Sequence, residues 1–81
     1  MSYNISKYDA IEQVKRLRID GILSYMPNLH PTSENRIKWV TEFIQYLEND
    51  YLGNHSGLRA CTAEFNRHYW IPKYKNDWSE V

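Results

Sequence analysis

The side chains best suited to chemistry lie in one stretch of the chain: His55, Cys61, Glu64 and His68. Zinc sites pair close ligands at short spacings such as C-x2-C or H-x3-H, and neither spacing occurs here. Glu64 and His68 are four residues apart, so both could face one metal ion on a helix. The same spacing is that of an ordinary surface pair. The sequence therefore predicts no metal site.

Nucleophilic catalysis by Cys61 and His68 is disfavoured by their separation. Seven residues rise about 10 Å along a helix, whereas a nucleophile and its base must lie within hydrogen-bond reach. The motifs G-x-x-x-x-G-K, G-x-G-x-x-G and G-x-S-x-G, which mark phosphate loops and nucleophile elbows, are missing from the sequence. We therefore expect no cofactor and no enzymatic activity. The sequence leaves open only a catalytic site formed by residues that folding brings together.

A second set of residues suits the recognition of nucleic acid: Arg59, Asn66 and Arg67, followed by Lys73 and Lys75. Arg and Asn side chains can hydrogen-bond the edges of guanine and adenine. At about 100° per residue, the first three share one face of the predicted last helix, and the two lysines extend it. Ten basic and ten acidic residues give a net charge of zero. That balance excludes bulk attraction to nucleic acid but leaves a local basic face.

Aromatic residues form the third set, at 15% of the chain, including three Trp and seven Tyr. Trp and Tyr dominate the energetics of protein interfaces. Three of the rings recur at steps of four and three along one edge of the predicted second helix, where the alternative is a place in the core. Three more lie at or beyond the end of the last helix. The predicted partner-binding residues are Trp39, Phe43, Tyr46, Trp70, Tyr74 and Trp78.

Turn-forming residues divide the chain into three helix-length segments and a tail. The first segment begins at Ser6, a predicted N-cap. One straight helix as far as Met26 would place Lys15 and Arg18 on the apolar face, and burying unpaired charges is costly. We therefore predict a break near Asp20-Gly21, followed by a short helix from Gly21 to Met26.

The second segment opens at Pro31-Thr32 and closes at Gly53, which is expected to form a left-handed cap. Its predicted core stripe is Ile37, Val40, Phe43, Ile44, Leu47 and Tyr51. With Trp39 and Tyr46 added, the apolar arc covers about half the circumference, whereas a core stripe covers little more than about 100°. This helix is therefore expected to have neighbours on two sides, or to present one side to something else.

The third segment starts at Ser56, a predicted N-cap, and its apolar stripe is Leu58, Cys61, Phe65 and Tyr69. We expect this helix to end by Trp70 or Ile71, because proline disfavours helical backbone in the residue before it and Pro72 comes next. Residues 72–81 are then a short aromatic and basic tail.

Together these patterns predict an all-α fold: a small bundle of three main helices in a single domain, residues 1–81, with 72–81 as its tail. The chain contains no apolar run near the ~20 residues of a membrane span, so no membrane association is expected. Cys61 is the single cysteine, so no intrachain disulfide can form. No secretory signal is visible, and we expect a cytoplasmic protein.

The favoured function is that of a small non-catalytic protein that binds a protein partner, as an adaptor, an inhibitor or a subunit of an assembly. A homodimer formed through the same rings is a variant of this hypothesis. The alternative is a regulator that binds nucleic acid through the basic face of the third helix and the tail.

Overall fold

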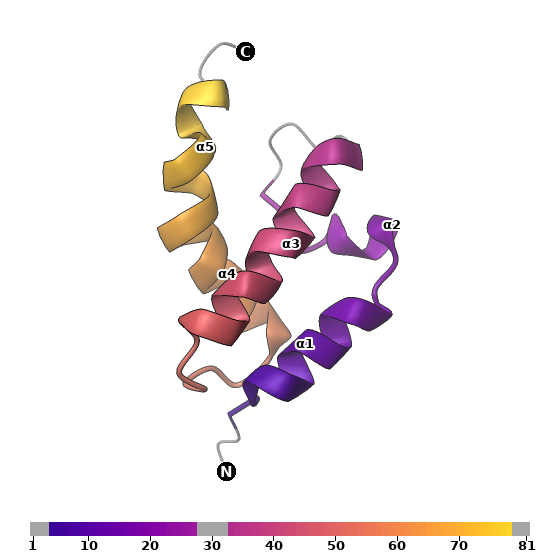
Figure 1. The fold of residues 1–81 in the computed structure, drawn as a ribbon, viewed down its shortest axis with the longest axis vertical. Coiled ribbons are helices and arrows are strands. Elements are labelled where there is room, and N and C mark those ends of the chain that lie inside the picture. The colour runs from indigo at the N-terminus through magenta and orange to yellow at the C-terminus, as the bar shows by residue number, and fades with distance from the viewer. Residues whose placement is uncertain (1–3, 28–32, 79–81) are drawn as a thin grey trace.

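The computed structural model describes residues 4–27 and 33–78, and the side chains in these ranges except those at positions 19, 20, 33 and 75–78. Within these ranges the chain forms helices and no strands, so the predicted all-α class is confirmed (Figure 1). The bundle arrangement stays a prediction. The elements in chain order are α1 (Lys7–Arg16), α2 (Ile19–Ile22), α3 (Ser33–Asn49), α4 (Leu58–Phe65), the π-helical turn η1 (Asn66–Trp70) and α5 (Ile71–Trp78).

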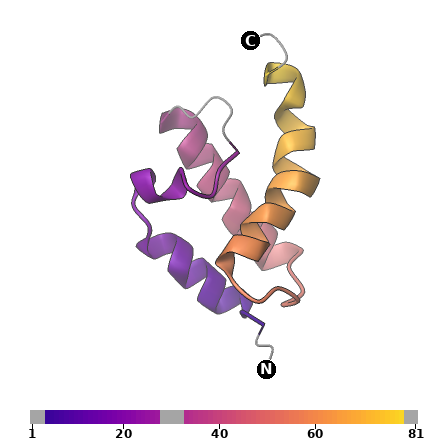
Figure 2. The same ribbon diagram turned by 180° about the vertical axis from the view of Figure 1, so that it is seen from behind.

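Helix α3 is the central element. It contacts α1 and α2, and it also contacts α4. Helix α4, η1 and α5 follow one another without a break and form a single rod that crosses α3 (Figures 1 and 2). Helix α3 therefore has neighbours on two sides, which is one of the two arrangements predicted from its wide apolar arc.

Helix α1 begins where the sequence predicts. The hydroxyl of Ser6 accepts a hydrogen bond from the backbone N–H of Asp9 at 3.1 Å, which satisfies one of the free donors of the first turn. The helix ends at Arg16, where Leu17 turns to extended backbone and its N–H donates to the carbonyl of Val14. The predicted interruption is present, but it lies before Arg18 rather than at Asp20-Gly21.

The short helix α2 also differs from its prediction, since it covers Ile19–Ile22 instead of Gly21–Met26. Asp20 and Gly21 therefore lie inside this helix and do not start it. A Cβ atom at position 21 would lie 3.4 Å from Cδ2 of Leu17. Glycine at this position thus lets Leu17 pack closely against α2, and it does not break the helix.

The buried side of α3 is rotated relative to the predicted stripe. Trp39, Phe43 and Leu47 are completely buried, whereas Ile37 is 57% exposed and Val40 only partly buried. The reason is tertiary: the rings of Trp39 and Phe43 pack against Phe65 of α4, with centroid distances of 5.7 and 5.2 Å. The rod therefore covers one edge of the apolar arc and leaves the other edge at the surface.

The loop between α3 and α4 shifts both predicted caps. Gly53 has a left-handed φ of 74°, as expected, but α3 has already ended at Asn49, so this glycine shapes the loop and not the helix end. The N-cap of α4 is Gly57 and not Ser56, and it makes no side-chain capping bond.

The predicted end of the third helix before Pro72 is wrong. The N–H of Ile71 donates to the carbonyl of Asn66, a five-residue spacing that defines the π turn. Pro72 is the second residue of α5 and directly follows this turn, so the change of hydrogen-bond spacing coincides with the residue that lacks an N–H. The helix continues to Trp78, so most of the predicted tail is helical.

Candidate functional site: an apolar groove and a polar pocket

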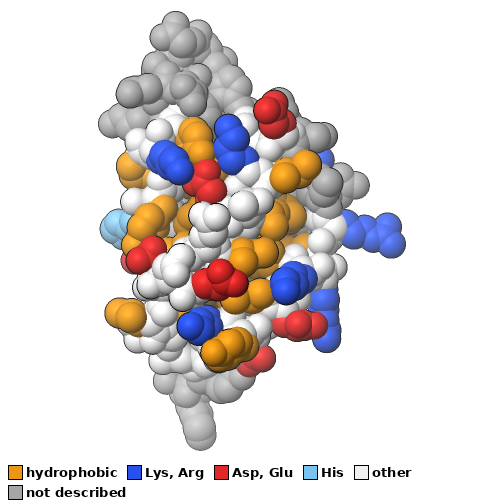
Figure 3. All heavy atoms as spheres, viewed as in Figure 1, with side chains coloured by type: hydrophobic (Ala, Val, Ile, Leu, Met, Phe, Trp, Pro, Cys, Tyr) orange, Lys and Arg blue, Asp and Glu red, His pale blue; other side chains and the backbone are white. Residues whose placement is uncertain are grey.

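A groove with a volume of about 240 Å³ runs between α3 and the α1–α2 segment. We call it the apolar groove. Figure 3 shows hydrophobic side chains gathered along the line where α1 and α3 meet. The groove is lined by Val14, Lys15, Leu17, Ile22, Arg36, Ile37, Val40 and Thr41.

The hydroxyl in the lining of this groove is already hydrogen-bonded within its own helix. The hydroxyl of Thr41 donates to the carbonyl of Ile37 one turn earlier at 2.9 Å, so its hydrogen-bonding capacity is used within α3. Ile37 and the partly buried Leu17 and Val40 supply apolar surface around it. The two charged residues of the lining, Lys15 and Arg36, are both basic. The arrangement suits an apolar group that carries acidic neighbours.

Four of the six predicted partner-binding aromatics belong to the core: Trp39, Phe43, Tyr46 and Trp70 are at most 7% exposed. Burial of this kind takes Trp39, Phe43 and Trp70 out of the accessible surface, whereas Tyr46 still lines a cavity. Their rings form one connected cluster, with Trp39 stacked on Phe43 at 5.1 Å. The sequence interpretation chose the wrong edge of the arc, since Trp39 and Ile37 have exchanged the roles predicted for them.

Of the two remaining aromatics, Tyr74 is partly buried and links α5 to α3. Its hydroxyl donates to the carboxylate of Glu42, which also pairs with Lys73 at 3.1 Å. The ring of Tyr74 lies 4.4 Å from that of Trp70. The side chain of Trp78 lies outside the described residues.

The predicted basic face is not assembled as one surface. Asn66 is a structural bridge: its Oδ1 accepts from Nε1 of Trp39 and its Nδ2 donates to the carbonyl of Tyr25, both at 2.7 Å. Arg59 lies over the ring of Tyr25 at 5.4 Å, and Arg67 lies 3.6 Å from the Glu64 carboxylate. Lys73 is paired with α3, as described above. The side chain of Lys75 is outside the described residues.

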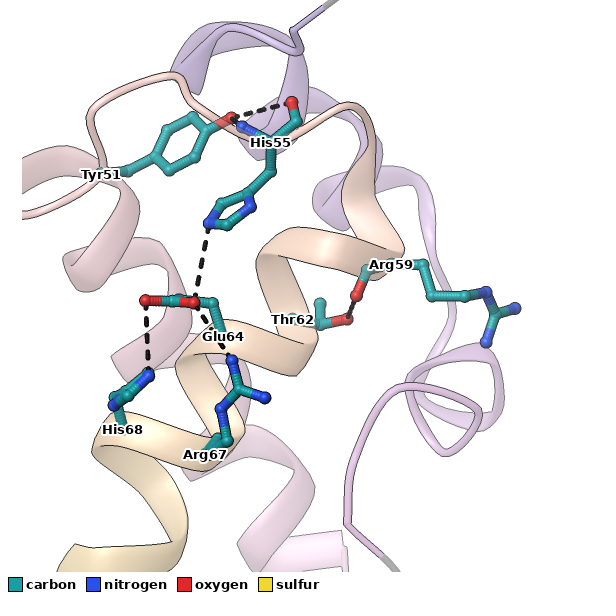
Figure 4. A network of polar contacts seen from close by, with 7 residues as sticks. All are labelled: Tyr51, His55, Arg59, Thr62, Glu64, Arg67 and His68. Carbon is teal, nitrogen blue, oxygen red and sulfur yellow. Dashed lines mark hydrogen bonds and ion pairs between the residues drawn. The ribbon is translucent and has the colours of Figure 1, made fainter.

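On the other side of α3 a second cavity of about 240 Å³ opens beside the loop before α4. We call it the polar pocket. Its lining includes the rings of Tyr46, Tyr51 and Tyr69 and the side chains of Asp50, His55 and Glu64. Figure 4 shows Glu64 at the centre of the polar network beside this pocket, with His55 reaching toward it from the loop and Arg67 and His68 from the following turn.

The contacts of the Glu64 carboxylate are long. Nε2 of His55 lies 3.9 Å from Oε1, Nη2 of Arg67 lies 3.6 Å from Oε1, and Nε2 of His68 lies 3.6 Å from Oε2. Hydrogen bonds between charged groups are commonly 2.7–2.9 Å. The sequence anticipated the Glu64–His68 pair from its four-residue spacing, but His55 joins it only through the fold of the loop.

Burial changes the acidity of three groups near this pocket. Burial, with a smaller effect from the Glu64 carboxylate, raises the pKa of Tyr46 to about 12. Burial also raises the pKa of Tyr51 to about 12, with a smaller effect from its hydrogen bond with Cys61. Burial likewise raises the pKa of the Cys61 thiol. All three groups are therefore neutral near pH 7, and Cys61 is not an activated nucleophile.

Two further features, a metal-binding cluster and a membrane-spanning helix, are not found in the described part of the chain. Its His, Cys, Asp and Glu side chains form no group of three or more placed to hold a metal ion. None of its helices combines the length and the apolar character needed to cross a bilayer.

The apolar groove and the polar pocket are thus interpreted from geometry alone. Comparison of this chain with known protein families, with curated proteins and with solved structures finds no match.

Proposed function

We propose that this chain is a small non-catalytic binding protein that holds a segment of a partner protein in the apolar groove, as an adaptor, an inhibitor or a subunit of an assembly. The observation that carries the proposal is the exposure of Ile37. The Ile37 side chain is 57% exposed although it lines the apolar groove. Burying this apolar surface under a docked partner would stabilise the complex.

The size of the groove favours a partner's side chains over a small molecule. Pockets for drug-sized ligands are commonly 300–1,000 Å³, and this groove offers about 240 Å³. A short row of apolar side chains from an amphipathic helix fits such a shallow depression, since that is how helices dock into grooves.

The charges of the groove specify the partner further. Lys15 and Arg36 are basic, and the lining contains no acidic residue. A docked segment with Asp or Glu beside its apolar residues is therefore favoured over a basic one. Nucleic acid is the weaker candidate, because Asn66 is engaged in the core and Lys73 and Arg67 have acidic neighbours within the chain.

The test is a selection from a library of random peptides displayed on phage, with the folded protein as bait. We expect enrichment of peptides with apolar residues at helical spacing and acidic neighbours. Binding of the selected peptides should be lost with Ile37→Asp, which adds a charge to the groove at an exposed position.

Leu52→Asp is the matched control, because Leu52 is 81% exposed and lies outside the groove. Selected peptides that bind the Ile37→Asp variant as well as the original chain would refute the proposal. Sedimentation of the protein alone tests for self-association. A dimer that Ile37→Asp dissociates would identify a second copy of the chain as the occupant of the apolar groove.

A further inference from the structure

We propose that the polar pocket binds a primary ammonium group, from either a free alkylamine or a lysine side chain. This proposal is independent of the function assigned to the apolar groove. It rests on three features of the pocket: its aromatic walls, its two carboxylates and the hydroxyl of a tyrosine in its lining.

The walls are tyrosine rings set at angles to one another. The Tyr46 ring lies 5.0 Å from that of Tyr69 with 53° between their planes, and 6.3 Å from that of Tyr51 with 52° between their planes. Inclined rings form a corner, and the faces of aromatic rings carry negative potential. A cation in such a corner is attracted by the rings as well as by formal charges.

Two carboxylates line the same cavity, those of Asp50 and Glu64. Asp50 has no ion pair among the described residues. Glu64 has three nitrogen neighbours, but at 3.6–3.9 Å none of them is within hydrogen-bond distance. Its oxygens are therefore able to accept hydrogen bonds from a compact donor, and an ammonium group carries three N–H donors.

The third feature is the hydroxyl of Tyr46. This side chain is only 7% exposed, yet it lines the pocket. A phenolic oxygen accepts hydrogen bonds, so a bound ammonium group could donate one to it. Because the pKa of Tyr46 is raised to about 12, the hydroxyl stays neutral and does not itself become a counter-ion.

The basic side chains nearby set the competition. Arg67, His55 and His68 approach Glu64, and Lys73 lies beside Tyr69 in the neighbouring depression. Arg67 is the one of these with a permanent charge that contacts Glu64, and its side chain is 72% exposed. It is therefore held loosely, and an entering ammonium group would displace it from the carboxylate.

The experiment is a titration of the folded protein, followed by NMR, with butylamine hydrochloride and, separately, with butanol, at constant pH and ionic strength. We expect butylamine to shift the resonances of Tyr46, Tyr69 and Glu64 in a saturable way, and butanol to leave them in place. Equal effects of the two compounds, or no saturable shift with butylamine, would overturn the proposal.

Three variants make the test specific to the carboxylate. Glu64→Gln should weaken butylamine binding about fivefold, the effect of one partly exposed charge pair, and Arg67→Gln should strengthen it by removing the competing cation. Glu34→Gln, on the exposed first turn of α3, is the matched control and should have no effect. Unchanged affinity in both of the first two variants would overturn the assignment.

Two further probes define the ligand. Tetramethylammonium has no N–H donor, and binding as tight as that of butylamine would refute the hydrogen-bonded ammonium. Nα-acetyl-lysine methylamide separates the two sources: tighter binding than butylamine identifies a lysine side chain, and weaker or equal binding identifies a free amine.

Discussion

Replacing Asn66 by alanine removes the two hydrogen bonds through which α4 and η1 are joined to α3 and to the end of the α2 segment. The indole of Trp39 is 0% exposed, so its N–H cannot turn to water instead. Leaving a buried donor unpaired costs about 1–3 kcal/mol, and the net loss of an ordinary hydrogen bond about 0.5–1.5 kcal/mol. The half-buried carbonyl of Tyr25 belongs to the second class.

The free energy of unfolding should therefore fall by about 2–4 kcal/mol in Asn66→Ala. For a domain of this length, 1 kcal/mol corresponds to about 4–8 °C, so Tm should fall by roughly 10–25 °C. Thermal and urea unfolding followed by far-ultraviolet circular dichroism measure both quantities. Asn66→Asp keeps an oxygen acceptor for Trp39 and should lose less.

Asn49→Ala, at the exposed end of α3, is the matched control and should change the free energy of unfolding by less than about 0.5 kcal/mol. The double variant Trp39→Phe/Asn66→Ala should be less destabilised than the sum of its two single variants, because both changes break the same bond. A loss below about 0.5 kcal/mol in Asn66→Ala, or strict additivity in the cycle, would refute this reasoning.

Three further outcomes are expected. Burial raises the pKa of the Cys61 thiol, so this thiol should resist iodoacetamide in the folded protein and react only in denaturant, which mass spectrometry can measure. Rapid alkylation of the folded chain would contradict the core position of Cys61. Tyr46 and Tyr51 should ionise near pH 12, not 10, in an absorbance titration in which Tyr→Phe variants assign each step. Because the folded state holds these protons more tightly, the contribution of the two tyrosines to the free energy of unfolding should be constant below pH 10 and fall between pH 10 and 12. Gly53→Ala should lower the free energy of unfolding by about 1–2 kcal/mol because of the left-handed φ, although no atom lies within 4 Å of the added Cβ. Gly57→Ser, at the N-cap of α4, should not lower it. Equal effects of the two variants in urea unfolding would rule out the backbone explanation.

Those local features that depend on neighbouring residues could be predicted from the sequence. Helix α1 begins after Ser6 because the Ser6 hydroxyl caps its first turn. Gly53 adopts a left-handed φ because glycine has no Cβ to oppose it. The wide apolar arc of α3 also indicated a second surface. Periodicity therefore determined the all-α class, but it left open whether both sides of the arc are covered.

Which edge is uncovered was decided by tertiary structure. The residues from Ile37 to Leu47 are apolar on both sides of the arc, so the helix alone has no preference that separates Trp39 from Ile37. Docking of Phe65 onto Trp39 and Phe43 buries one side, and Ile37 remains at the surface. The α3 residues that supply apolar surface to the candidate groove, Ile37 and Val40, are thus ones that the sequence pattern assigned to the core.

The end of the last helix shows the same division. The prediction that the helix ends before Pro72 rests on the steric conflict between proline and helical backbone in the preceding residue. In the structure Ile71 is nevertheless helical, and the π turn at Asn66–Trp70 changes the hydrogen-bond spacing directly before Pro72. The hydrogen bonds of Asn66 to Trp39 and Tyr25 hold this turn in place from elements 27 and 41 residues away. The sequence by itself determined the helices and their apolar faces, while long-range contacts, which no local pattern encodes, decided what each face covers.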